Sequence, residues 1–293
     1  MRCYMLVFLL VLQNGDTRSQ DTNATSHLIP KNFKTIMPLE INERGIVIPT
    51  YWGQNKIRVD LLWDNNSPTW ANEGIIRDVT PVSKSKNYFY STTTADGSGI
   101  KGNIYECNKI SLGDITFLNI PFYEIDDPMQ GAFGDNMISK GIWEINFKAK
   151  KIIFTSNMDS LEDLDQAQLL PANFANDVIK IPVHFRNNIT ENIDVDFGFD
   201  DFILLPEPDF IKIIKGNDKT YKRAMQFSTP AKTDTLINTY AFDTISIQDN
   251  KFKTVFCSNE KASEKLIGLR FFEQFDFVIF DYPNKLFYIS KKE

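Results

Sequence analysis

The sequence predicts an all-β chain folded as two homologous lobes with a central cleft between them. Two observations carry this prediction. Short strand-like runs follow one another from about Phe33 to the end of the chain, and several segments recur in the same order at a nearly constant spacing. The strand-like runs are rich in β-branched and aromatic residues and are bounded by Gly, Asn, Asp or Pro. Examples are Gly45–Thr50, Lys56–Trp63, Ile115–Phe122 and Lys150–Thr155.

Helical signals are few. Leu161–Leu170 has room for a turn or two, and Pro208–Lys215 and Lys261–Phe275 place apolar residues at three- and four-residue steps. This spacing predicts two short helices in the second half of the chain.

The recurring segments define the lobes, because internal repeats mark repeated structural units. One large sandwich or barrel without internal symmetry is the alternative architecture. Three matches in one order favour two homologous lobes. The matches are Leu61–Asp64 with Ile193–Asp196, Ile110–Ile120 with Ile245–Val255, and Ile145–Ser156 with Phe280–Lys291.

We expect residues 1–20 to be a signal peptide, 21–160 the N-terminal lobe and 161–293 the C-terminal lobe. The apolar run Tyr4–Leu12 follows a positively charged start, and it is too short to cross a bilayer, which takes ~20 residues. A polar stretch follows it. The pattern predicts an exported protein (periplasmic, cell-surface or extracellular) with no membrane span.

The composition is that of an ordinary globular protein, with 42% hydrophobic and 24% charged residues. A formal net charge of -6 argues against a nucleic-acid partner. Cys107 and Cys257 fall in different halves, so we do not expect them to pair, although an oxidising compartment would permit it. The two histidines, His27 and His184, leave almost nothing for a His-based triad or metal site. A Cys257/His184 dyad has no supporting motif around either residue.

Two similar motifs each follow a strand, one in each half. Asp64-Asn65-Asn66-Ser67-Pro68-Thr69 occupies the first half and Asp196-Phe197-Gly198 the second. Each half later carries two apolar residues and a Gly, at Ala132–Gly134 and Leu266–Gly268. Their joint order, from about Ile36 to Lys291, resembles bacterial exported aspartyl proteases of the pepsin/retropepsin type. In that family each lobe has Asp-Thr-Gly at the place of these motifs.

The resemblance implies a bilobal pepsin-like acid-protease fold with Asp64 and Asp196 as catalytic residues. Asn65, Asn66, Ser67, Phe197 and Gly198 would then form the catalytic loops. Two carboxylates in close contact cannot both ionise, so they share one proton. The ionised one takes a proton from water, and the protonated one donates to the peptide carbonyl oxygen. This chemistry needs no metal and no cofactor. The implied partner is a peptide or protein substrate, and the oligomeric state stays open.

The motifs also depart from that family. Thr is replaced by Asn65 and Phe197, and one Gly by Asn66. The resemblance implies that the Thr hydroxyls tie the two loops together. The Asn65 amide can still donate a hydrogen bond, whereas Phe197 cannot. Asn66 is tolerable because Asn adopts left-handed conformations more readily than most residues. We expect Phe197 to lie at the lobe interface and to weaken catalysis, either by changing the loop spacing or by filling the cleft.

Two further expectations concern neighbouring segments. The Ser67 hydroxyl is placed either to bind the Asp64 carboxylate or to cap the turn. Ala95–Gly99 is either the tip of a flap hairpin over the cleft or an ordinary hairpin turn. The sequence therefore supports two functions, an aspartic endopeptidase or a non-catalytic, peptide-binding pseudo-protease.

Overall fold

The structure is a computed structural model that describes residues 26–79, 82–93, 99–127, 129–175, 178–215, 219–228, 233–248, 250–259 and 262–291. The predicted signal peptide, 1–20, lies outside the described residues. So does all of the predicted flap tip except Gly99.

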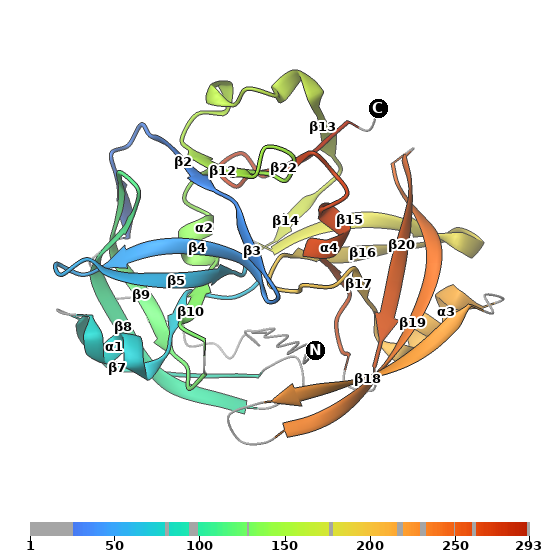
Figure 1. Cartoon of the computed structure of the whole chain (residues 1–293), viewed down its shortest axis with the longest axis horizontal. Helices are drawn as coiled ribbons and strands as arrows, with labels where there is room; N and C mark the ends of the chain where they lie inside the picture. The colour runs from blue at the N-terminus through green and yellow to red at the C-terminus, as the bar shows by residue number, and fades with distance from the viewer. Residues whose placement is uncertain are drawn as a thin grey trace.

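The described residues fold mainly as β-strands, which form two barrel-like lobes (Figure 1). The first half of the chain holds β1 (His27–Ile29), β2 (Lys34–Pro38), β3 (Glu40–Asn42), β4 (Gly45–Trp52), β5 (Ile57–Trp63), β6 (Trp70–Ala71), α1 (Glu73–Asp78), β7 (Val82–Thr93), β8 (Gly99–Leu112), β9 (Ile115–Glu124), β10 (Gly131–Phe133), α2 (Asp135–Ile138), β11 (Ile142–Asn146) and β12 (Lys151–Thr155).

The second half repeats this order after two 3-10 turns, η1 (Met158–Ser160) and η2 (Leu164–Gln166). It holds β13 (Ala167–Leu170), β14 (Asn173–Ala175), β15 (Val178–Phe185), η3 (Arg186–Asn188), β16 (Ile189–Asp196), β17 (Ile203–Leu204), α3 (Glu207–Ile214), β18 (Thr220–Ser228), β19 (Thr233–Ile247), β20 (Asn250–Ser258), β21 (Leu266–Gly268), α4 (Leu269–Phe272), β22 (Phe277–Asp281) and β23 (Leu286–Ser290).

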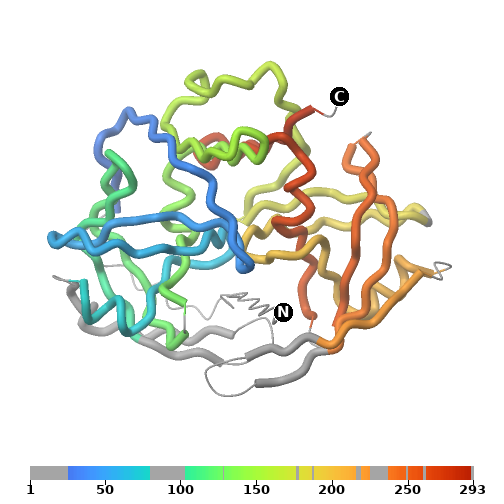
Figure 2. The backbone as a smooth tube through the Cα atoms, in the orientation of Figure 1, coloured from blue at the N-terminus to red at the C-terminus, as the bar shows by residue number. Residues whose placement is uncertain are grey.

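Three sheets organise the described strands. Lobe one is built on the sheet ordered β1-β9-β6-β10-β5-β4-β8-β7, and lobe two on the sheet ordered β14-β15-β16-β21-β17-β20-β19-β18. A third sheet, β13-β23-β22-β11-β12-β2, takes strands from both halves and joins the lobes, because β11 pairs with β22. Figure 2 shows the blue-to-green half on one side and the yellow-to-red half on the other.

The repeats predicted from the sequence are structurally equivalent hairpins. β8 and β9 turn between Leu112 and Ile115, and β19 and β20 turn between Ile247 and Asn250. In the sheet that joins the lobes, β11–β12 corresponds to β22–β23. The prediction of two all-β homologous lobes is confirmed.

One helix prediction is correct and one is mostly wrong. α3 lies within one residue of the predicted helix at Pro208–Lys215. Within the described part of the predicted helix at Lys261–Phe275, which is 262–275, only α4 is an α-helix, and Leu266–Gly268 is strand β21. Strand β21 pairs with β16 on one side and with β17 on the other. The apolar spacing that predicted a helix therefore comes from a buried strand followed by one helical turn.

An aromatic core lies between the lobes and the sheet that joins them. Trp63 is fully buried, contacts Trp143 edge-on at a centroid distance of 4.9 Å, and lies 5.8 Å from Phe280. Such ring pairs stabilise a core beyond the area they bury. Because Trp63 ends β5, this core supports the loop that follows.

Candidate functional site

Asp64 and Asp196 occupy equivalent places in the two lobes. Asp64 directly follows β5, and its N–H donates to the Phe133 carbonyl of β10 at 3.1 Å. Asp196 ends β16 and is in register with Gly268 of β21. In both lobes these two strands run parallel. The two aspartates of the sequence repeat thus lie at the ends of equivalent strand pairs, one in each lobe.

Each aspartate loop is held by an equivalent glycine. Gly134 precedes α2 with φ -97 and ψ -178, and Gly268 precedes α4 with φ -99 and ψ -179. A Cβ at Gly134 would lie 2.2 Å from the Pro68 carbonyl carbon, and one at Gly268 would lie 2.4 Å from the Phe199 carbonyl oxygen. A side chain would therefore push away the loop on which the aspartate sits.

Backbone amides orient both carboxyl groups in the same way. The Asn66 N–H donates to Asp64 Oδ1 at 3.2 Å, and the Gly198 N–H donates to Asp196 Oδ1 at 2.8 Å. Each bond spans two residues, so each loop is an Asx turn. Equivalent hydrogen bonds thus hold the two carboxyl groups in the two halves.

The two carboxyl groups meet at Gly198. Its N–H holds Asp196, while a Cβ added to it would lie 2.7 Å from Cγ of Asp64. Asp64 is 5% exposed and Asp196 1% exposed. Absence of a side chain at position 198 is thus what allows one carboxyl group to approach the other.

The surroundings favour the protonated form of this pair. Burial raises the pKa of Asp64 well above its ordinary value, and the charge of Asp196 raises it further. Burial also raises the pKa of Asp196, against the stabilising Gly198 N–H. A pair of this kind titrates as a unit and retains one proton over a wide pH range.

Asn65 connects the two lobes. Its Nδ2 donates to the Val195 carbonyl at 2.6 Å, and its Oδ1 accepts the Phe197 N–H at 2.9 Å. Asn65 is fully buried. The sequence prediction that the Asn65 amide can donate is confirmed, and one side chain supplies both a donor and an acceptor to the opposite loop.

Phe197 lies at the lobe interface, where its N–H donates to Asn65 of the opposite loop and its side chain turns into the core. Its ring is fully buried and lies 5.1 Å from both Phe272 and Phe280. The ring therefore extends the aromatic core beneath the loop, and the alternative in which it fills the cleft is wrong. The loop loses a hydroxyl donor but gains apolar packing.

One detail of the loops differs from expectation, at Asn66, and a second decides between the two alternatives left open for Ser67. Among the described residues with positive φ, neither Asn66 nor Gly198 occurs, so the left-handed tolerance of Asn is not used at position 66. The Ser67 hydroxyl donates to the Pro68 carbonyl at 3.0 Å, which places its hydrogen bond within the turn and away from the Asp64 carboxylate.

A hollow of about 480 Å³ lies on the lobe-one face that carries Asp64. Because side chains alternate along a strand, Leu62 and Asp60 of β5 point to the same face as Asp64. Val47 of β4 lies opposite Leu62. The residues lining the hollow are Glu40, Ile41, Asn42, Arg44, Val47, Asp60, Leu62, Met129, Gln130 and Gly131.

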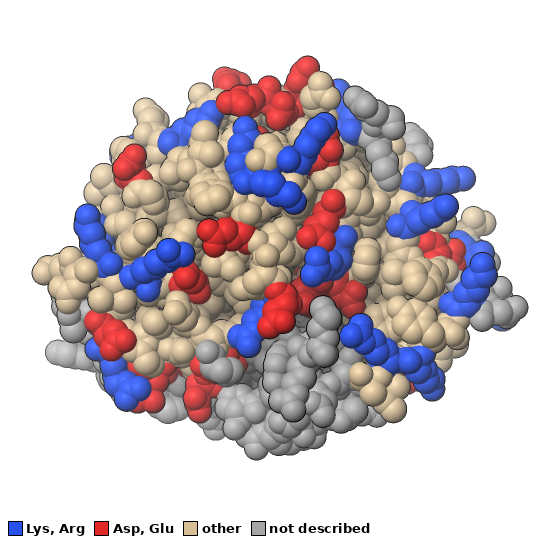
Figure 3. All heavy atoms as spheres, in the orientation of Figure 1, with Lys and Arg blue, Asp and Glu red and all other residues tan. Residues whose placement is uncertain are grey.

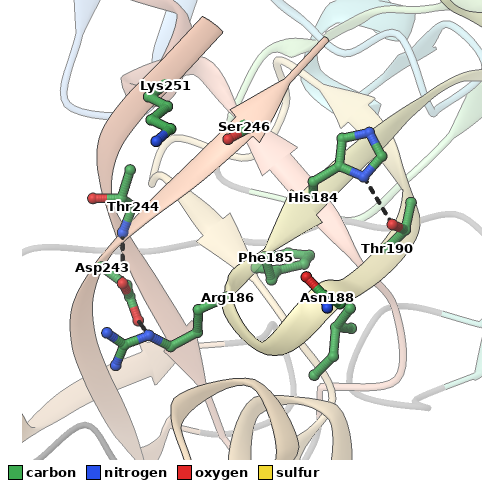
Figure 4. A pocket seen from close by; sticks show the side chains of 10 residues that line it. His184, Phe185, Arg186, Asn188, Thr190, Asp243, Thr244, Ser246 and Lys251 are labelled. Carbon is green, nitrogen blue, oxygen red and sulfur yellow. Dashed lines mark hydrogen bonds and ion pairs between the residues drawn. The ribbon is translucent and has the colours of Figure 1, made fainter. Parts of the chain in front are cut away.

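A larger hollow, of about 710 Å³, lies at the far end of the β15–β16 hairpin (Figure 4). His184 Nδ1 shares a hydrogen bond of 2.8 Å with Thr190 Oγ1, and Arg186 pairs with Asp243 at 3.1 Å. Thr190 precedes Asp196 by six residues, which is about 20 Å along a strand. This hollow is therefore remote from the aspartate pair.

The remaining chemistry of the described residues is sparse. Cys107 and Cys257 are buried free thiols, and the described residues contain no group of three metal-ligating side chains. No described helix has the length and apolarity to cross a membrane. The face seen in Figure 3 mixes acidic and basic side chains over its described part.

The fold is similar to that of solved pepsin-like proteins. An aspartic proteinase from Irpex lacteus superposes with a TM-score of 0.59 at 15% identity, covering 89% of this chain and 98% of that chain. Conglutin gamma from lupine seeds (TM-score 0.57) and basic 7S globulin from soybean (TM-score 0.53) each share 9% identity and cover 89% of this chain and 96% of theirs. No protein-family model and no curated protein sequence matches the chain. At these identities the comparisons establish the pepsin-like bilobal fold alone.

We expect stability to fall as pH rises from about 4 to 7. Burial raises the pKa of Asp127 and Asp200 to about 6 and that of Glu264 to about 7, and it also raises those of Asp64 and Asp196. Below about pH 4 these groups are protonated in both states, so the free energy of unfolding is highest there. At higher pH the unfolded chain releases protons that the folded chain retains, and stability declines.

Urea unfolding at pH 4, 5.5 and 7 measures this slope. Glu264→Gln, which cannot titrate, should flatten it between pH 5.5 and 7. A free energy of unfolding that rises from pH 4 to 7 would show that paired carboxylates with lowered pKa values dominate instead.

Proposed function

We propose that this chain is an aspartic endopeptidase that binds an extended peptide between its lobes and hydrolyses it with Asp64 and Asp196. The observation that carries the proposal is that two buried carboxyl groups, one from each lobe, approach each other at Gly198. The retention of cross-lobe hydrogen bonds by Asn65 supports it.

The chemistry follows from one shared proton. The ionised carboxylate of the pair accepts a proton from water as the water oxygen bonds to the peptide carbonyl carbon. The protonated carboxyl donates its proton to the carbonyl oxygen, giving a gem-diol. The carboxyl group that took the water proton then passes it to the leaving nitrogen as the C–N bond breaks. The other carboxylate accepts a proton from one gem-diol hydroxyl as the carbonyl re-forms, which restores the singly protonated pair, and no covalent enzyme intermediate forms.

A non-catalytic peptide-binding protein is the second candidate. The observation that favours it is Phe197, whose ring packs on Phe272 and Phe280, so that its side chain supplies no hydrogen-bond donor to the opposite loop. Only the Asp64 loop then supplies side-chain hydrogen bonds to the opposite loop, through Asn65, so the distance between the carboxyl groups is less tightly fixed. Small displacements of catalytic groups lower rates by about a hundredfold.

The apolar segment Tyr4–Leu12 supports a further proposal, that the protein is exported like the bacterial aspartyl proteases its motifs resemble. Sequencing the N-terminus of the native protein tests this, since a product that begins at Met1 and stays in the cytoplasm would contradict export.

A peptide-library digest distinguishes the two functions. The purified mature protein is incubated with the library between pH 3 and 7, with and without a statine-type inhibitor whose hydroxyl mimics the gem-diol. Burial raises the pKa of both Asp64 and Asp196, to about 7 for Asp196, so both carboxyl groups are protonated at acid pH. We therefore expect inhibitor-sensitive cleavage to increase from pH 3 towards pH 7, as the pair releases one of its two protons and gains an ionised base. Binding of library peptides without cleavage at any pH would favour the second candidate. Absence of both would exclude both functions.

A further inference from the structure

The hollow at the far end of the β15–β16 hairpin is lined by polar side chains from four neighbouring strands (Figure 4). Thr190 of β16 pairs with His184 of β15. His184 also pairs with Ser246 of β19, and Ser246 pairs with Lys251 of β20. Directly paired residues of antiparallel strands share a face, with Cβ atoms about 5 Å apart. These four side chains therefore form one row across the sheet.

Ser246 forms the floor of the hollow, and longer side chains stand on either side of it. Its two neighbours in the row, His184 and Lys251, are exposed, whereas Ser246 is half-buried. The Cβ atoms of these neighbours are ~10 Å apart, because Ser246 lies between them. All three residues line the hollow of about 710 Å³. A hydroxyl group thus lies at its base, with an imidazole and an ammonium group at its sides.

The lining carries an excess of positive charge. It contains Arg186 and Lys251, against a single carboxylate among the described residues, that of Asp243. Both Asp243 oxygens already accept hydrogen bonds or ion pairs. Oδ2 lies 3.1 Å from Arg186 Nε, and Oδ1 accepts the Thr244 N–H at 2.8 Å. Lys251 forms no ion pair with another described residue, so its charge is available to a ligand.

The equivalent place in lobe one has different chemistry. Ser111 stands there in the position of Ser246, and it pairs with Tyr51 on one side and Thr116 on the other. A phenol and a hydroxyl group therefore replace the imidazole and the ammonium group. The cationic row belongs to lobe two, and the repeated fold does not require it.

We propose that this hollow binds a small molecule that carries a phosphate or sulfate group, with the oxyanion above Ser246 and between His184 and Lys251. A tetrahedral oxyanion has acceptor oxygens in several directions, and the donors here converge from the floor and both sides. Hydrogen bonds from an ammonium group to an anion are about twice as strong as neutral ones. A protonated imidazole donates from both ring nitrogens, so His184 can keep its 2.8 Å bond to Thr190 and also donate to the anion.

The hollow has room for more than the oxyanion. A volume of about 710 Å³ is typical of small-molecule pockets, and Phe185 and Ile189 give the lining an apolar part. The carbon skeleton of the ligand would lie there. Because Thr190 is about 20 Å from Asp196 along β16, the inference does not depend on peptide binding or hydrolysis between the lobes.

Titration calorimetry with inorganic phosphate, sulfate and acetate tests the inference on the purified mature protein. Sodium chloride keeps the ionic strength equal in all titrations. Phosphate and sulfate should bind at one site, and the tighter of the two identifies the group that the natural ligand carries. Acetate has two oxygens in place of four, so it should bind about tenfold more weakly, the effect of losing one hydrogen bond to a charged group.

Two variants with opposite expected effects assign the binding to this hollow. Lys251→Met should weaken phosphate binding about tenfold, since it removes a charged donor. Asp243→Asn should strengthen it, because it removes the negative charge while its side-chain oxygen can still accept the Thr244 N–H. A general loss of folding cannot produce both results.

Lys222→Met is the matched control, because it removes the same charge from an exposed position on β18. Lys222 pairs with β19 seven residues before Ser246, which is about 23 Å along the strand. This variant should leave the Kd for phosphate unchanged.

Three results would overturn the inference. They are the absence of phosphate and sulfate binding, binding that Lys251→Met leaves unchanged, and binding that Lys222→Met weakens as much as Lys251→Met does. The proposed function would stand in each case, because cleavage or binding of library peptides tests it separately.

Discussion

Asp196→Asn should abolish peptide cleavage and make the protein more stable at neutral pH. Asparagine neither accepts nor donates the shared proton, and positioned proton transfer contributes about 10²–10⁴-fold to a rate. We expect kcat/KM to fall by at least ~10³-fold, since the reaction has no other general base. Asn also has no charge to bury, so the free energy of unfolding at pH 7 should rise, because burial raises the pKa of Asp196 and opposes its ionisation.

Activity and urea unfolding measured on the same preparations test both parts of this prediction. Asp276→Asn is the matched control, because Asp276 is half-exposed and paired with Lys148 at 2.6 Å. It should change neither property strongly. Cleavage that persists in Asp196→Asn would mean that another group, or a contaminating protease, performs it. A loss of stability at pH 7 would show that the pair is held as stabilised carboxylates.

Phe197→Thr should destabilise the protein strongly and should not increase its activity. The sequence alone makes this substitution attractive, because Thr stands at the equivalent position of the family motif. In the structure the ring packs on Phe272 and Phe280 inside a closed aromatic core. Truncating a buried phenylalanine costs about 3–5 kcal/mol, and an unpaired buried hydroxyl adds to that cost.

Phe242→Thr provides the comparison, since Phe242 is 54% exposed on β19. Its substitution should cost about 1 kcal/mol or less, as is usual for exposed positions. Equal costs for the two variants would mean that the core relaxes around position 197. Increased cleavage by Phe197→Thr, corrected for the folded fraction, would show that the hydroxyl clasp matters more than the aromatic packing.

Much of the fold and part of the site were predictable from local pattern. β-hairpins, alternating apolar residues and turn residues are encoded by neighbouring positions, so their repetition reveals two lobes. The placement of Asp64 and Asp196 follows, because each lies at the end of the equivalent strand of its repeat. The amphipathic α3 was predictable for the same reason, since a partly exposed helix shows its periodicity.

The sequence alone therefore determined the all-β class, the twofold repetition and the identity of the paired aspartates. Only the tertiary structure decided how the loops beside the aspartates are held together, because this depends on contacts between residues that are distant in the chain. Asn65 binds the Val195 carbonyl and the Phe197 amide only when the lobes meet. The ring of Phe197 turns into the core because Phe272 and Phe280 are there to receive it. Local sequence does not record these partners, since they come from strands and helices far along the chain.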